Sequence, residues 1–426
     1  MKLSNWVKFL LDSGRLRQLC GIPDVEHMKA VLTEFWSRFR QMDETHQVFQ
    51  LASENVLELS LTIPIYSHAD EGRSYKHQAL WVLSSHGALG RGTRAYINRN
   101  KHRTPLRRNQ MGLNFVGQTW STQFTFCTLL RAVANQYPDS LDTLTALYAE
   151  DLERLAHEGV VSTDGALRVW CVHIGVKGDL PALTKLGGFK RSFSHVAKAP
   201  SSKKPSQGVC PYCLAGVEGD NNASHQPWED FSSQPKWART MQRGVPWDHP
   251  PSIMKGALVS PGKESSFFKL DIWHNFHLGV SKHWLGSSLI AIMESADLPF
   301  EHGTRSVEAK LEWMTRDYLK FCGDKRISPF VTELSRESLG FPTGSASPIG
   351  HWNKGAASTH IMLYLENICE RFIKGKTEEP TLCAIELGTR MMNTVIAYLY
   401  TQGFWLQSVK GVRVSAMIMV FLQCYA

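Results

Sequence analysis

Apolar residues recur at helical spacing through the first 55 residues. The segment Val25–Phe49 has such a stripe, and a shorter one precedes it. The residues of the shorter stripe are Trp6, Phe9, Leu10, Leu16 and Leu19. We therefore predict a helical N-terminal segment over residues 1–55.

Runs rich in β-branched and aromatic residues follow at Leu57–Tyr66, Gln78–Ser85 and Thr119–Leu130. Such runs are typical of strands. A leucine stripe then predicts a helix over residues 131–158, and Leu167–Val176 predicts a fourth strand. Three strands, a helix and a strand form the core order of an RNase H-like fold, in which the first and fourth strands lie side by side. We predict a mixed α/β protein with this core over residues 56–189.

The pattern changes after residue 189. Residues 190–300 begin with a stretch rich in Ser, Pro, Lys and Gly, and we predict an insertion there. Its last part, Phe267–Ile292, is apolar and predicted to be helical. Residues 301–426 form a predicted helical C-terminal part. Its most apolar segment, Val412–Ala426, is too short to span a bilayer and predicts a buried helix. The chain ends within this pattern, as a fragment or a shortened copy would.

Two carboxylates follow predicted core strands. Asp70 comes shortly after the first strand and Asp179 shortly after the fourth. Acids on adjacent strand ends can share Mg²⁺ or Mn²⁺, because hard cations prefer clustered anionic oxygens. Two such ions activate a water and stabilise a leaving oxygen in phosphodiester cleavage. The alternative is that each Asp is a turn or cap residue, which is common at strand ends.

The closely spaced pair Cys210 and Cys213 predicts a structural Zn²⁺ site. Thiolate and imidazole are preferred zinc ligands, and His274 and His277 lie on one face of a predicted helix downstream. A redox dithiol is one alternative, and two unrelated buried cysteines are another. The nine cysteines are otherwise scattered, which favours a reducing compartment.

Positive charge concentrates in the segment 91–108, which holds no acid. Its cations are Arg91, Arg94, Arg99, Lys101, Arg103, Arg107 and Arg108. Crowded cations are stabilised by phosphates, so we predict that this segment binds DNA, the alternative being a solvated loop. Further cations follow Asp179, between residues 185 and 204. The chain lacks a P-loop, a G-x-G-x-x-G and a G-x-S-x-G motif, so ATPase, dinucleotide-enzyme and nucleophile-elbow hydrolase classes have no motif support.

Two sequence blocks resemble those of a transposase family. The block from Gly178 to Phe189 followed by Cys210-x-x-Cys213 is similar to the "D-L-P-A-x-x-K-x-x-G-F … C-x-x-C" pattern of CACTA (En/Spm-like), Plavaka-type and KDZ-type transposases. The block from Asp271 to His283 resembles their "D-x-M-H-N-x-x-L-G-x-x-K-H" pattern. The blocks occur in the family's order and cover some 60 residues.

This resemblance implies an RNase H-like domain with three catalytic acids that cut and join DNA with two divalent ions. Asp179 would be the second acid and Asp70 the first. The third would lie on a helix after the insertion. The nearest equivalent stretch, Trp352–His360, has no carboxylate. We take Glu366 as the third acid, with Glu308, Glu312 and Glu370 as alternatives.

Three hypotheses follow. The first is a nuclear transposase-like enzyme, or a degenerate copy, that acts on DNA and assembles as a homo-oligomer. The second is a catalytically dead, domesticated module that binds DNA or protein on the same fold. The third is a zinc-stabilised scaffold that binds RNA or protein, in which Asp70 and Asp179 are structural. The geometry of these two acids discriminates among them.

Overall fold

The computed structural model describes residues 1–22, 24–73, 79–90, 92–101, 111–113, 121–193, 207–217, 228–301, 306–342 and 347–426. The chain forms two compact units. Unit 1 comprises residues 1–230, 234–270 and 400–406, and unit 2 comprises residues 231–233, 271–399 and 407–426. The residues around Cys210 therefore belong to unit 1, whereas the block that starts at Asp271 belongs to unit 2.

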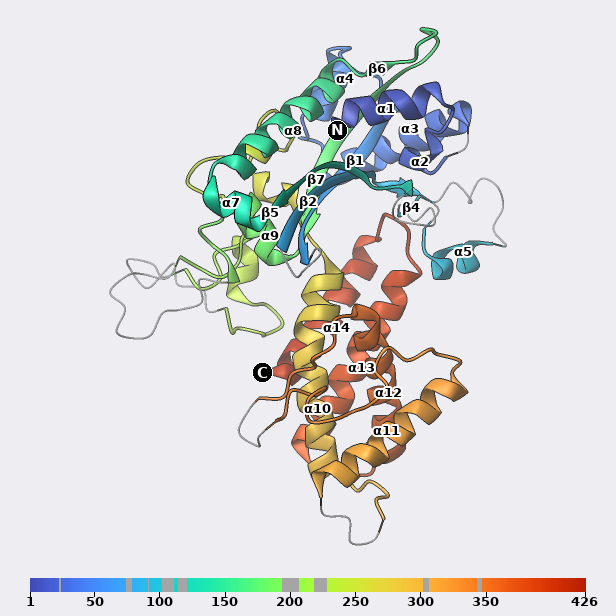
Figure 1. Cartoon of the computed structure of the whole chain (residues 1–426), viewed down its shortest axis with the longest axis vertical. Helices are drawn as coiled ribbons and strands as arrows, with labels where there is room; N and C mark the ends of the chain where they lie inside the picture. The colour runs from blue at the N-terminus through green and yellow to red at the C-terminus, as the bar shows by residue number, and fades with distance from the viewer. Residues whose placement is uncertain are drawn as a thin grey trace. The chain divides into compact units, whose positions relative to one another are not determined.

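Unit 1 is a mixed α/β unit whose main sheet has the strand order β5-β2-β1-β7-β6 (Figure 1). A further strand, β8, also pairs with β7. The strands are β1 (Thr62–Arg73), β2 (Ala79–Gly87), β5 (Phe124–Leu130), β6 (Val160–Val161), β7 (Arg168–Gly178) and β8 (Phe268–Leu270). A two-stranded sheet joins β3 (Leu89–Gly90) and β4 (Gly112–Leu113). The structure thus places the predicted first and fourth strands side by side, and they run parallel.

The helices of unit 1 begin with the predicted N-terminal segment. They are α1 (Leu3–Asp12), α2 (Arg17–Cys20), α3 (Val25–Met42), α4 (Val48–Ser53), α5 (Arg94–Asn100), α7 (Arg131–Gln136), α8 (Ser140–His157) and α9 (Leu180–Leu186). Short 3₁₀ turns lie at Leu59–Leu61, Lys236–Thr240, Ser252–Met254 and Glu264–Phe267. The predicted helix over residues 131–158 is therefore two helices. The helical character of the N-terminal segment is confirmed, but the stretch Val25–Phe49 is divided between α3 and α4, and the stripe before it is divided between α1 and α2.

Consecutive residues of β1 face opposite sides of the sheet, and each side is covered. Ser67 contacts the buried Tyr148 of α8, and its hydroxyl lies 2.8 Å from Nε2 of His173 on β7. On the other side, the ring of Tyr66 stacks on Phe404, which also contacts Phe35 of α3. The sheet is thus enclosed by α8 on one face and by α3 with the segment 400–406 on the other.

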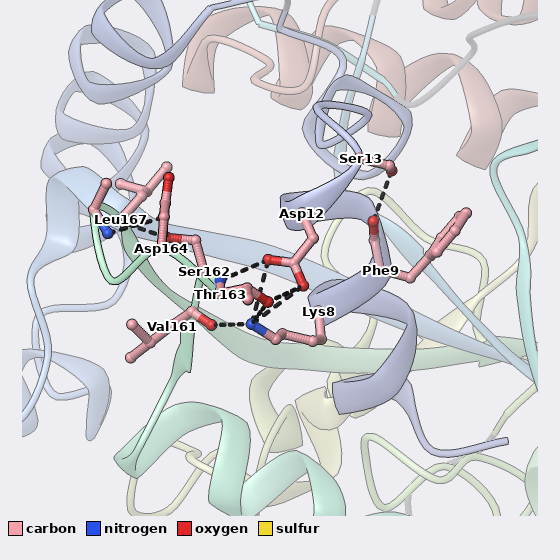
Figure 2. Close-up of polar contacts among 10 residues, drawn as sticks. Lys8, Phe9, Asp12, Ser13, Val161, Ser162, Thr163, Asp164 and Leu167 are labelled. Atoms are coloured by element: carbon pink, nitrogen blue, oxygen red, sulfur yellow. Dashed lines mark hydrogen bonds and ion pairs between the residues drawn. The ribbon is translucent and has the colours of Figure 1, made fainter.

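A polar cluster ties α1 to the turn between β6 and β7 (Figure 2). The Lys8 ammonium donates to the Val161 carbonyl at 2.9 Å and to the Thr163 hydroxyl at 2.8 Å. The Asp12 carboxylate accepts from the Thr163 amide and hydroxyl, each at 2.8 Å. These bonds lower the pKa of Asp12, the amide of Thr163 being the main cause. The cluster holds the N-terminal helix against the start of β7.

Unit 2 is helical in its described part. Its helices are a π-helix (Trp273–Val280), α10 (Ser281–Ser295), α11 (Val307–Asp324), α12 (Gly355–Phe372), α13 (Pro380–Tyr400) and α14 (Ser408–Tyr425). The predicted helix Phe267–Ile292 is wrong at its start, because Phe268–Leu270 pairs with residues 176–178 of β7 as strand β8. Among the helices that the structure describes, none is both long and apolar enough to cross a membrane.

Candidate functional site

The carboxyl end of β7 lies beside the last third of β1 at one edge of the unit 1 sheet. Ala69 of β1 pairs with Gly178, the last residue of β7. A side chain on Gly178 would collide with the backbone, because its Cβ would lie 2.5 Å from the Ala69 carbonyl oxygen. The glycine therefore permits the close approach of the two strands, and Asp179 follows directly at the point where they meet.

Asp179 is the N-cap of α9. Its Oδ1 accepts a hydrogen bond from the Ala182 amide at 2.7 Å, and Pro181 stands in the first turn, where a missing N–H costs nothing. The prediction that a strand-end Asp serves as a cap is thus confirmed for Asp179. The cap uses one carboxylate oxygen and leaves the second, Oδ2, outside this hydrogen bond.

Asp179 also lines a pocket of about 580 Å³ at this edge. The lining combines two acids, two cations, an amide and apolar groups from β1, β2, α7 and α9. Its residues are Glu71, Trp81, Arg131, Asn135, Asp179, Pro181, Ala182 and Lys185. Trp81 is only 3% exposed, and the Lys185 ammonium lies 5.0 Å from the centre of its ring. The acidic and basic side chains around the buried Trp81 ring suit a ligand that carries both positive and negative charge.

Glu71 is the β1 acid of this pocket. The Arg131 guanidinium donates to its Oε1, and this hydrogen bond holds the pKa of Glu71 below its ordinary value. The same ion pair raises the pKa of Arg131. The Glu71 side chain is 18% exposed and that of Arg131 is 55% exposed. Glu71 is therefore ionised and held on a rigid strand, whereas its cation partner stands at the surface.

Asp70, the predicted first acid, is not among the residues that line the pocket. The strand continues to Arg73, so Asp70 lies inside β1 and not after it. Asp70 pairs with Val82 and Glu71 pairs with Trp81, and neighbouring residues of a strand face opposite sides. The structure thus brings Asp179 together with Glu71, a residue that sequence reasoning missed. A longer strand prediction with strict alternation would have found it.

Glu366, the predicted third acid, lies in unit 2 on α12. Its Oε2 accepts a hydrogen bond from Nδ2 of Asn393 on α13 at 2.6 Å. Burial between the helices raises the pKa of Glu366. Its setting therefore favours the neutral form, the reverse of the setting of Glu71.

Cys210 and Cys213 lie in a turn that spans residues 207–217, here called the cysteine turn. A bridge between Gln207 and Val217 closes it, and the Leu214 amide donates to the Thr240 hydroxyl at 2.9 Å. The two thiols are hydrogen-bonded to each other, which lowers the pKa of Cys210 to about 6 and raises that of Cys213. The hydrogen bond thus favours ionisation of Cys210 and opposes ionisation of Cys213.

His274 and His277 lie in unit 2, in the π-helix. Nδ1 of His274 is 2.6 Å from Oδ2 of Asp271, whose other oxygen accepts from the Trp273 amide at 2.7 Å. His277 is buried, with Nδ1 at 3.2 Å from the Thr359 hydroxyl, and burial lowers its pKa. Within the described ranges, no three His, Cys, Asp or Glu side chains form a group that could hold a metal ion.

The predicted DNA-binding cations are described in part. Arg94 and Arg99 lie on α5 and Lys101 follows it, whereas Arg91, Arg103, Arg107 and Arg108 lie outside the described residues. Arg99 donates to the Thr401 hydroxyl at 2.9 Å, and the Thr93 hydroxyl donates to the Tyr400 carbonyl. The segment 400–406 therefore holds α5 within unit 1.

Neither a protein-family model nor a curated protein matches the chain.

Proposed function

We propose that the chain is a transposase-like, DNA-binding protein with an RNase H-like core that would cut and join DNA by two-metal-ion chemistry. The strand order supports this proposal, because β1 and β7 are neighbours as the first and fourth strands of that core are. The observation that carries it is the pocket shared by Asp179 and Glu71 at the end of these strands. Glu71 takes the place of Asp70 as the first acid in this proposal.

The carboxylates of Glu71 and Asp179 suit Mg²⁺ or Mn²⁺, since both ions prefer anionic oxygens. Such ions supply the Lewis-acid chemistry that activates a water and stabilises a leaving oxygen. The chain's own residues contribute position and charge. Asp179 is fixed by its cap, Glu71 by its strand, and Lys185 supplies positive charge beside them for a phosphodiester. Glu366 stays the prediction for the third acid.

Zinc is the second part of the proposal. The cysteine turn offers two adjacent sulfur ligands, and thiolate is the form that binds zinc. His274 has the arrangement of many zinc-bound histidines, with one ring nitrogen bonded to a carboxylate, here that of Asp271. His277 is the other imidazole ligand of the sequence prediction, but within the described ranges these four side chains do not form a group that could hold a metal ion, so the two sulfur atoms carry this part of the proposal.

Nicking of supercoiled plasmid by the purified chain tests the cutting activity in Mn²⁺ and in Mg²⁺. We expect nicking that Asp179→Asn reduces by more than ~100-fold, because loss of even the outer partners of metal ligands costs ~10–100-fold. Asn keeps the cap, so folding is preserved. Asp142→Asn, on the exposed first turn of α8, is the matched control and should nick normally. Glu71→Gln should lose nicking and Asp70→Asn should retain it.

A second candidate function is a module that binds DNA without cutting it. The ion pair between Glu71 and Arg131 favours it, because Arg131 neutralises one of the two acids in the pocket. Wild-type chain that binds DNA with a salt-dependent affinity but nicks no plasmid in either metal would establish this function and exclude the first.

A further inference from the structure

The Glu71–Arg131 ion pair can act as a latch, because it occupies one of the two proposed catalytic acids. Its two side chains differ in how tightly the structure holds them. Glu71 sits within a paired strand, whereas Arg131 is the first residue of the short helix α7 and has a side chain that is 55% exposed. Water reaches the Arg131 member of this pair and screens it, and ordering the long arginine side chain costs entropy, so the pair contributes little free energy. Arg131 can therefore leave Glu71 for a stronger anion at small cost.

The pocket offers Arg131 a place for such an anion. Lys185 lines the same pocket with its ammonium over the Trp81 ring, and Asn135 lies one turn after Arg131 on α7. Guanidinium binds phosphate oxygens through two parallel hydrogen bonds, a geometry that a single contact with Glu71 Oε1 does not use. A phosphodiester held by Arg131 and Lys185 would meet two cations, and the departure of Arg131 would free the Glu71 carboxylate in the pocket that Asp179 and Lys185 also line.

We propose that Arg131 is a substrate-sensing latch: a nucleic-acid phosphodiester draws it from Glu71, and this exchange opens the Glu71–Asp179 pair to a divalent cation. Metal and phosphodiester then bind cooperatively. The phosphodiester takes Arg131 away from the carboxylate that the metal needs, and the metal takes Glu71 away from the guanidinium that the phosphodiester needs. Coupling of this kind is reciprocal, so each ligand raises the affinity of the other by the same factor. The inference rests on the proposed metal-dependent function of this pocket, and it names Arg131 as a positioning residue that acts through Glu71.

Mn²⁺ binding measured by electron paramagnetic resonance tests the latch without any cutting step. The full chain is titrated with Mn²⁺ on ice, alone and with a short single-stranded DNA oligonucleotide. For the wild type we expect the oligonucleotide to tighten Mn²⁺ binding about two- to fivefold, the range that an exposed ion pair can supply. Arg131→Ala should bind Mn²⁺ alone at the tightened level and show no further effect of the oligonucleotide.

Two matched variants sharpen the measurement. Arg38→Ala removes another exposed, ion-paired arginine of unit 1, far along the chain on α3, and should behave as the wild type. Glu71→Gln should weaken Mn²⁺ binding with and without the oligonucleotide. Inorganic phosphate in place of the oligonucleotide should produce a smaller effect, and an equal effect would overturn the assignment to nucleic acid.

The proposal is overturned if Arg131→Ala leaves unchanged both the Mn²⁺ affinity and the effect of the oligonucleotide on it. It is also overturned if neither the wild type nor Arg131→Ala binds Mn²⁺. Its failure is distinct from failure of the cutting activity. If the wild type shows the coupling but nicks no plasmid, the latch proposal stands and the cutting activity is excluded. If it nicks plasmid without the coupling, the cutting activity stands and the latch proposal is excluded.

Discussion

The two units place their candidate site residues in opposite electrostatic settings. In unit 1, the pKa of Glu71 is lowered by Arg131 and that of Cys210 by the Cys213 thiol, so each charged form is favoured. In unit 2, burial raises the pKa of Glu366 and lowers that of His277, so each neutral form is favoured. The difference teaches that a candidate acid is judged by what surrounds it, because a cation and an apolar contact move its pKa in opposite directions.

The largest expected effect concerns the cysteine turn. We predict about one Zn²⁺ per chain, as in a closed structural site, and its loss in Cys210→Ser and Cys213→Ser. Elemental analysis of the purified chain measures the ratio. Cys383→Ser alters an exposed cysteine of unit 2 and should keep the metal.

Removal of zinc by a chelator should also make the cysteine turn sensitive to protease, since metal binding and local folding are coupled. His274→Gln and His277→Gln, measured in the same way, decide whether the histidines are ligands. A metal-free wild-type chain would remove the zinc proposal and leave the two cysteines as a hydrogen-bonded thiol pair.

Two substitutions of Asp179 separate the effect of its cap hydrogen bond on stability from the effect of its charge. Asp179→Ala should lower the free energy of unfolding of unit 1 by ~1 kcal/mol, the usual cost of an N-cap, whereas Asp179→Asn should change it little. Urea denaturation followed by circular dichroism measures both. Equal stability of the Ala variant and the wild type would mean that the hydrogen bond to the Ala182 amide does not hold α9.

Glu366→Gln should stabilise the protein at pH 7 by roughly 0.5 kcal/mol after allowance for solvent screening. A folded-state pKa above the unfolded value means that the ionised carboxylate opposes folding, and this cost disappears as the pH falls through the folded pKa. The side-chain oxygen of a glutamine at this position still accepts the hydrogen bond from Nδ2 of Asn393. The difference between variant and wild type should therefore vanish below about pH 4, where Glu is protonated in both states.

Glu71→Gln should have the opposite sign and the smallest effect. A folded-state pKa below the unfolded value gives stability that is present above about pH 4.3 and is lost as the pH falls through the folded pKa. Gln should thus destabilise slightly at pH 7 and not at all in strong acid. The same sign for both variants at pH 7 would break the contrast between the units.

The local pattern of apolar and polar residues predicted much of the fold. The leucine stripe of α8 and the stripes of the N-terminal helices were readable from periodicity, because each helix buries one face against the core. The strands β1, β2, β5 and β7 were readable as runs of β-branched and aromatic residues. The parallel neighbours β1 and β7 followed from the order of these elements. The cap role of Asp179 was also within reach, since Pro181 follows it and an acid often precedes a helix.

The candidate site was within reach only in part. Asp179 could be singled out as a strand-end carboxylate, but its partner depended on where β1 ends. A one-residue difference exchanges Asp70 for Glu71, because alternation sends neighbours to opposite faces. The strand β8 was missed because three residues acquire strand geometry only through pairing with β7.

The sequence by itself determined most of the elements, their order and the chemistry of single residues: a capping acid, two close thiols and clustered cations. Only the tertiary structure decided which of these meet. It set Glu71 and Asp179 in one pocket, brought Arg131 to Glu71, and divided the chain after Leu270 so that the cysteines and histidines belong to different units. The physical reason is that periodicity reports burial along one element, whereas a site forms between elements, where strand register and helix placement select the partners.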